Sequence, residues 1–119
     1  MIKVAESKHY IICKEYETVF LLRKRSEKVI AKIGDFYGDV EKAIIAPSEK
    51  YCVMAGCGII LYYLRPPFAS YRYGKKTDQW KEWYRDGNVW IEDIALQGDI
   101  LIARTETGEE RRIPLESHS

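Results

Sequence analysis

The residues whose side chains could carry out chemistry are few, and their spacing does not suit it. The chain has two histidines and three cysteines. His9 and Cys13 are four residues apart on an expected strand, so they share a face but lie too far apart for the contact that a Cys–His nucleophile requires. Cys52 and Cys57 flank an expected turn and lack the two further ligands of a zinc site. We therefore expect no catalytic residue, no metal and no cofactor.

Motifs for nucleotide binding and for common hydrolases are also absent. The sequence contains no GxxxxGK[ST], GxSxG or HExxH pattern. Two acidic pairs, Glu15 with Glu17 and Glu92 with Asp93, could take part in acid–base chemistry, but such pairs on a small domain are mostly solvated surface. The residue types favour a protein that binds over one that catalyses.

The composition indicates one soluble domain without a strong overall charge. Its 119 residues carry 19 basic and 18 acidic side chains, so the whole-chain field attracts neither a nucleic acid nor a basic protein. An odd number of cysteines in strand-like segments argues against a disulfide framework. The first residues lack the apolar run of a signal peptide, and the longest uncharged stretch, 51–64, is too short to span a membrane. We expect a cytoplasmic protein.

The stretch 38–64 reads as short apolar runs divided by turn residues, and parts of it recur on both sides. Residues 10–22 match 51–63 in their apolar positions, and 38–46 match 87–95. A repeat of about 40 to 45 residues has the size of a four-stranded blade. We expect one domain over 1–119, with degenerate repeats at about 1–37, 38–86 and 87–115 and a frayed tail at 116–119. Strands are expected near 9–14, 17–23, 28–33, 40–46, 50–55, 59–64, 78–84, 89–95, 99–104 and 110–114.

Several expected strands are apolar at consecutive positions, which predicts cover on both faces. The runs 19–22 and 59–64 show this pattern, whereas a sheet with one wet face alternates apolar and polar residues. Stacked sheets provide cover on both sides. The segment 109–112 is charged throughout and is typical of a solvated edge strand at the end of a stack.

The middle unit resembles a blade of the WD-repeat proteins. The resemblance lies in Val40 to Tyr51 with its Ala-Pro-Ser-Glu-Lys turn, in the preceding Gly34-Asp35 and in the Tyr62-Tyr63 strand. The chain has Asp35 where the family favours His, and Tyr62-Tyr63 where it favours Trp-Asp. Because two and a half units cannot close a ring, the resemblance implies an all-β antiparallel meander forming an open half-propeller. The alternatives are a β-sandwich or an open barrel with one short helix near 78–86.

The clearest departure from the repeat is an insert over 65–76. It mixes aromatic and basic residues without an acidic one, as binding loops inserted into repeats often do. The following segment, 78–87, reads as a strand by its place in the repeat, or as a short helix capped by Asp78 and ended by Gly87. The predicted partner-binding residues are Arg65, Phe68, Tyr71, Arg72, Tyr73, Lys75, Lys76, Trp80, Trp83 and Tyr84. The alternative is that the aromatic residues of a long hairpin fold back over the core.

Four functions are compatible with these features. By analogy in size and composition, the chain is similar to small bacterial immunity proteins of contact-dependent growth inhibition systems, which bind and block a cognate toxin. The insert could instead hold a nucleic acid, with tyrosines stacking on bases. A small enzyme or ligand-binding barrel would place a pocket between blades, lined by Tyr62, Tyr63 and Trp90. A scaffold subunit would form a homodimer through an open sheet edge.

Overall fold

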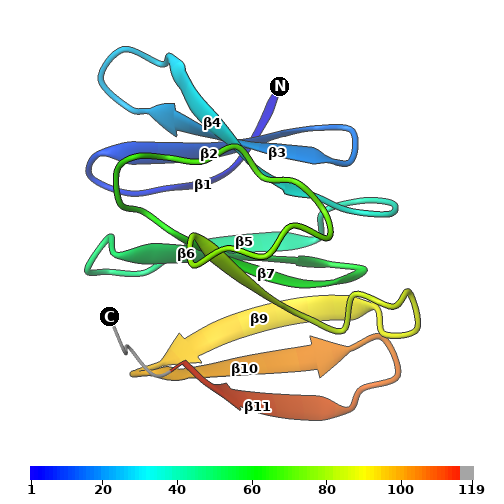
Figure 1. The fold of residues 1–119 in the computed structure, drawn as a ribbon. Helices are drawn as coiled ribbons and strands as arrows, with labels where there is room; N and C mark the ends of the chain where they lie inside the picture. Colours follow the sequence, from blue (N-terminus) through cyan, green and yellow to red (C-terminus); the bar gives the residue numbers. More distant parts are fainter. Residues whose placement is uncertain (116–119) are drawn as a thin grey trace.

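The computed structural model describes residues 1–115, which fold into three antiparallel β-sheets lying one above another (Figure 1). The first sheet contains β1 (Ile2–Glu6), β2 (Tyr10–Glu15), β3 (Thr18–Arg23) and β4 (Val29–Asp35). The middle sheet contains β5 (Lys42–Ile45), β6 (Tyr51–Gly56), β7 (Gly58–Tyr63) and β8 (Trp80–Trp83). The third sheet contains β9 (Ile91–Gln97), β10 (Ile100–Thr105) and β11 (Glu110–Pro114).

Each sheet is a meander in which consecutive strands are neighbours, and no sheet closes into a barrel. The all-β prediction is confirmed for the described residues. The alternative helix near 78–86 is wrong, because residues 80–83 pair with β7 as a strand. β1 was not expected, since its sequence Ile-Lys-Val-Ala-Glu is short and largely exposed. The expected tail at 116–119 lies outside the described residues.

The middle sheet is buried on both faces because its central strands carry apolar side chains at consecutive positions. Along β7, Ile60 and Tyr62 point into a core shared with the first sheet. Ile59 and Leu61 point into a second core shared with the third sheet. All four side chains are at most 2% exposed. The run of apolar residues therefore specifies a layer that is stable only between two others.

Alanine substitutions on the two faces of β7 test this arrangement. Ile59→Ala and Ile60→Ala should each lower the free energy of unfolding by about 2 to 5 kcal/mol, because each leaves a cavity in a separate dry core. Ile100→Ala, at a 39% exposed position, is the control and should change it by less than about 0.5 kcal/mol. Urea unfolding measures all three. A small loss for either core variant would contradict burial on both faces.

Glu49 joins the first and middle sheets through hydrogen bonds between two of their turns. It lies in the turn between β5 and β6 and accepts from the backbone N–H of His9 at 2.9 Å. The His9 ring Nδ1 lies 2.7 Å from its other carboxylate oxygen, and the Ser7 hydroxyl donates as well. The His9 and Ser7 side chains lower the pKa of Glu49 to about 2. The ionised form of Glu49 thus favours the folded state.

This lowered pKa predicts a loss of stability in acid. A carboxyl group whose pKa is lower in the folded chain stabilises the fold above its unfolded pKa, near 4.5, and loses that effect as the pH falls towards 2. The difference in unfolding free energy between the wild type and Glu49→Gln should therefore be constant near neutral pH and shrink between these values. Urea unfolding across this pH range measures it. A difference that does not change with pH would contradict the account.

Candidate functional site

The insert 65–76 leaves the end of β7, crosses from the middle sheet to the first sheet and returns to β8 (Figure 1). The backbone N–H of Tyr71 donates to the carbonyl of Lys32 on β4 at 2.8 Å. The Tyr62 hydroxyl donates to the Ala69 carbonyl at 2.6 Å. The insert is therefore tied to both sheets rather than extending freely from the middle sheet.

Three of the predicted partner-binding aromatic residues belong to the core instead. Tyr71 and Trp80 are 3% and 4% exposed, and their rings lie 4.9 Å apart. Phe68 is half-buried, with its ring edge-on to Tyr10. These side chains cover apolar surface between the first sheet and β8, as in the alternative reading in which a long hairpin folds back. Tyr71 and Trp80 therefore present almost no surface to a partner, and Phe68 presents only part of its ring.

Gln79 fixes the two ends of the insert, and sequence reasoning did not identify it. Its side chain is buried, and its Nε2 donates to the carbonyls of Tyr63 at 2.7 Å and Arg65 at 3.3 Å. Its Oε1 accepts from the backbone N–H of Ala69 at 3.3 Å. Nothing in the local sequence distinguishes this glutamine from a surface one, because its partners are backbone groups brought close only by folding.

Arg85 is a second unpredicted anchor, and it joins the first and middle sheets. Its guanidinium donates to the carbonyls of Cys57 at 2.9 Å and Asp35 at 2.5 Å, and it stacks 4.6 Å from the centre of the Phe36 ring. Its Nε lies 3.0 Å from Glu82 in an ion pair that lacks hydrogen-bond geometry. Glu82 also accepts from the Tyr71 hydroxyl. Burial, followed by this hydrogen bond, raises the pKa of Tyr71, so the hydroxyl keeps its proton.

Residues 72–76 of the insert form an exposed basic turn, called the basic tip below. The backbone N–H of Lys75 donates to the Arg72 carbonyl at 3.2 Å, and Gly74 adopts the left-handed conformation that the turn requires. The Tyr73 side chain is 66% exposed. Within residues 1–115, no carboxylate forms an ion pair with Arg72, Lys75 or Lys76. The tip therefore presents three positive charges without a counterion among the described residues.

The remaining predicted residues face the third sheet, on the other side of β8. Trp83 and Tyr84 are half-buried, and the Arg111 guanidinium lies 5.2 Å from the centre of the Tyr84 ring. Arg65 lies beside Tyr63, with its guanidinium 4.8 Å from the ring centre. The ten predicted residues are thus divided among the core, the basic tip and a second surface on the opposite face of the middle sheet.

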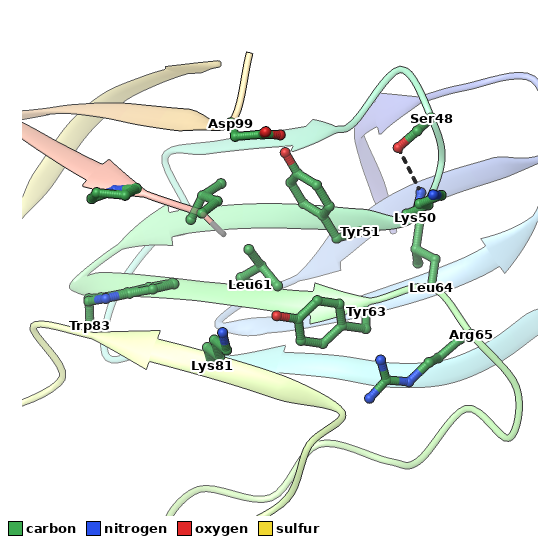
Figure 2. Close-up of a pocket in the computed structure, with 12 residues that line it drawn as sticks. Ser48, Lys50, Tyr51, Leu61, Tyr63, Leu64, Arg65, Lys81, Trp83 and Asp99 are labelled. Atoms are coloured by element: carbon green, nitrogen blue, oxygen red, sulfur yellow. Dashed lines mark hydrogen bonds between the residues drawn. The ribbon is translucent and has the colours of Figure 1, made fainter. Parts of the chain in front are cut away.

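On this second surface, Arg65 and Trp83 line a groove of about 450 Å³, called the groove below, between β7, β8 and the end of β11 (Figure 2). Aromatic and aliphatic side chains form its walls, and three basic residues line it. Figure 2 shows the Tyr51 hydroxyl directed towards Asp99, the one carboxylate among the lining residues. Burial, and then the charge of Asp99, raises the pKa of Tyr51. The lining includes Tyr51, Tyr63, Trp83, Pro114 and Leu115 together with Lys50, Arg65 and Lys81.

The pocket between Tyr62, Tyr63 and Trp90, which the small-enzyme or ligand-binding alternative requires, does not form. Tyr62 points into the core shared with the first sheet, whereas Tyr63 faces the groove on the other side. Trp90 packs on Gly38, where an added Cβ would lie 2.6 Å from the indole ring. Neighbouring residues on a strand point to opposite faces, so Tyr62 and Tyr63 cannot line the same pocket.

Cysteine, metal and membrane features complete the description. The three cysteines are buried and unpaired, and burial raises the pKa of the Cys52 thiol to about 12, which keeps it protonated. In the part of the chain that the structure describes, no cluster of three or more His, Cys, Asp or Glu side chains could hold a metal ion. Residues 1–115 also contain no helix long and apolar enough to cross a membrane.

Comparisons with models of known protein families and with curated proteins find no match for this chain. The geometry and charge of the basic tip and the groove are therefore the features that bear on function.

Removing the Gln79 side chain tests whether it anchors the insert. Gln79→Ala should lower the free energy of unfolding by about 1 to 3 kcal/mol, because it leaves buried backbone groups without a partner. Amide hydrogen exchange at Ala69 should become faster. Gln97→Ala, at an exposed position, is the matched control. A loss no larger than that of the control would contradict the anchoring role.

Proposed function

We propose that this chain is a non-enzymatic protein-binding domain whose basic tip contacts an acidic surface of its partner. The observation that carries this proposal is the exposed trio Arg72, Lys75 and Lys76, which lacks internal counterions and lies on an anchored loop. The charges of the whole chain nearly cancel. A local cluster of this kind can therefore direct a partner to one face of the domain.

The anchoring of the insert supports binding with a small loss of conformational entropy. Tyr71 and Gln79 hold the base of the loop through the contacts described above, so the tip is ordered before a partner arrives. A loop that is already ordered loses less conformational freedom when it binds. The Tyr73 ring is also exposed. Tyrosine and arginine are among the residue types that contribute most to the binding energy of protein interfaces.

In its finer form, the proposal is that the partner is a bacterial toxin and that this chain is a cytoplasmic immunity protein. Immunity proteins of contact-dependent growth inhibition systems are small domains that block a toxin by binding it. The near-neutral chain with one local basic patch suits a toxin that presents carboxylates at or beside its catalytic cleft. The basic tip, including its Tyr73 side chain, would cover that cleft.

We further propose that the three sheets are an open half-propeller. β1 packs against β5, and β5 packs against β9, so the first strands of successive sheets lie next to one another. This is the arrangement of strands around the axis of a propeller. The sequential meander of each sheet supports the same architecture.

Binding to the product of the adjacent gene tests the proposed function. Wild-type protein should bind that product and inhibit its toxicity. A triple variant, Arg72→Glu, Lys75→Glu and Lys76→Glu, should bind about tenfold to hundredfold more weakly, because it reverses the charge of the tip. Calorimetry and a growth assay measure the two effects.

The control variant reverses three exposed charges elsewhere, Lys8→Glu, Arg25→Glu and Lys28→Glu. It changes the net charge equally and should bind as the wild type does. Equal weakening by both variants would show that only net charge matters. Absence of any binding or inhibition by the wild type would refute the immunity function.

A nucleic acid is the second candidate partner, because Tyr73 lies exposed among the same cations. Stacking on tyrosine and phosphate contacts to basic side chains are the usual means of binding single strands. The protein-binding proposal predicts no measurable binding of single-stranded oligonucleotides at physiological salt. Affinity that is strong at low salt and falls steeply as salt increases would favour the nucleic acid instead.

A further inference from the structure

The third sheet has one strand fewer than the other two within the described residues. The first and middle sheets each contain four strands, whereas the third contains β9, β10 and β11. β9 packs against β5 and β6, and side chains of β10 and β11 complete the core over β7. Within residues 1–115, no strand therefore lies opposite the Lys81 and Trp83 face of β8, the outer strand of the middle sheet. The groove lies at this position (Figure 2).

The charges of the groove select an acidic occupant. Lys50, Arg65 and Lys81 line it, against the single carboxylate of Asp99 at the Tyr51 end. Lys50 and Lys81 form no ion pair with any residue in 1–115. The Lys81 amine and the Arg65 guanidinium lie 6.0 Å and 4.8 Å from the centre of the Tyr63 ring. A carboxylate beside this ring would lie near both cations, of which Arg65 also forms an ion pair with Asp78 at 3.7 Å.

The open edge of β11 offers backbone hydrogen bonds beside the groove. The backbone N–H of Thr105 donates to the Glu109 carbonyl, and that of Leu115 donates to the Asp99 carbonyl. These two residue pairs are therefore hydrogen-bonded pairs, one at each end of the β10–β11 ladder. Because such pairs alternate along an antiparallel ladder, the backbone groups of residues 110, 112 and 114 point away from β10. Proline occupies position 114, where no N–H is needed for pairing with β10.

We propose that the groove binds an extended acidic segment of another polypeptide. The segment pairs with the outward backbone groups of β11 and becomes the fourth strand of the third sheet. Its side chains alternate, so every second one enters the groove. Apolar side chains there contact Trp83, and carboxylates meet Lys81 and Arg65. This site is distinct from the basic tip and does not depend on which protein binds the tip.

The charges favour such a segment over a second copy of this chain. Two β11 edges that pair antiparallel around residue 112 would place Arg112 opposite Arg112 of the other copy, and like charges at opposed positions destabilise a sheet. The second copy would also direct its Arg111 and Ile113 into the groove, since these residues share the face of β11 that packs on the middle sheet. It would bring another positive charge to Lys81 rather than a carboxylate.

A peptide titration followed by NMR tests the proposal. The probe is a synthetic peptide in which threonines alternate with residues that face the groove. The groove-facing residues are one leucine and two glutamates. Binding at millimolar peptide should shift the backbone amide signals of Glu110 and Arg112 and the indole signal of Trp83, and should slow exchange of those two amides. A peptide with lysines in place of the glutamates should not bind.

Two variants separate the charge contribution from the backbone contribution. Lys81→Glu should weaken binding of the acidic peptide about tenfold by reversing a groove charge. Arg112→Pro removes one outward N–H without removing a β10–β11 bond and should bind about tenfold more weakly than Arg112→Ala, which removes the same charge but keeps the N–H. Lys28→Glu, on the turn between β3 and β4, is the charge control and should leave the affinity unchanged. Urea unfolding of each variant confirms that it is folded.

Several results would overturn the proposal. These are no shift at Glu110, Arg112 or Trp83 with the acidic peptide, equal binding of the lysine peptide, and full affinity in both Lys81→Glu and Arg112→Pro. Slow exchange at Glu110 and Arg112 that depends on protein concentration without peptide would assign the edge to a second copy instead. These outcomes do not bear on the basic tip, whose binding is measured with a different partner.

Discussion

The rest of the structure depends on the burial of the middle sheet on both faces. Its central strands carry apolar side chains at consecutive positions, so neither face can be left in water without exposing a row of them. The first and third sheets supply the two covers, and each core is closed only when its cover is present. The two covers bury β6 and β7 on both faces, whereas β8 is covered only in part. Both exposed surfaces discussed above border that strand.

Buried polar side chains then determine where the insert lies. An insert of aromatic and basic residues could collapse in many ways, but Gln79 and Arg85 offer hydrogen bonds to particular backbone carbonyls. Because an unsatisfied buried polar group is costly, these bonds favour one arrangement over the alternatives. As a result, three aromatic side chains, Phe68, Tyr71 and Trp80, pack in the core. The charged residues of the loop remain exposed. The arrangement separates the structural part of the insert from its binding part.

Most of the fold could be predicted from local pattern, and most of the site could not. The runs in β3, β6 and β7, and the recurrence of 10–22 in 51–63, were sufficient to place nearly all strands and to indicate stacked layers. β1 was missed because its five residues are too few to show a clear period, although Val4 and Ala5 pack against the core. For the site, sequence identified which residues were aromatic or basic but not which way they point. Tyr71 and Tyr73 are two residues apart, yet one is buried and the other exposed. The partners of Gln79 and Arg85 are backbone groups distant in sequence, which composition and spacing do not reveal.

The central claim is that binding uses the surfaces bordering β8, with the basic tip as the main contact. Amide hydrogen exchange of the complex with the product of the adjacent gene, compared with the free protein, tests it most directly. The account predicts slower exchange in 72–76 on complex formation, and unchanged exchange in the turn between β3 and β4. Protection confined to the first sheet, with 72–76 exchanging as in the free protein, would contradict it.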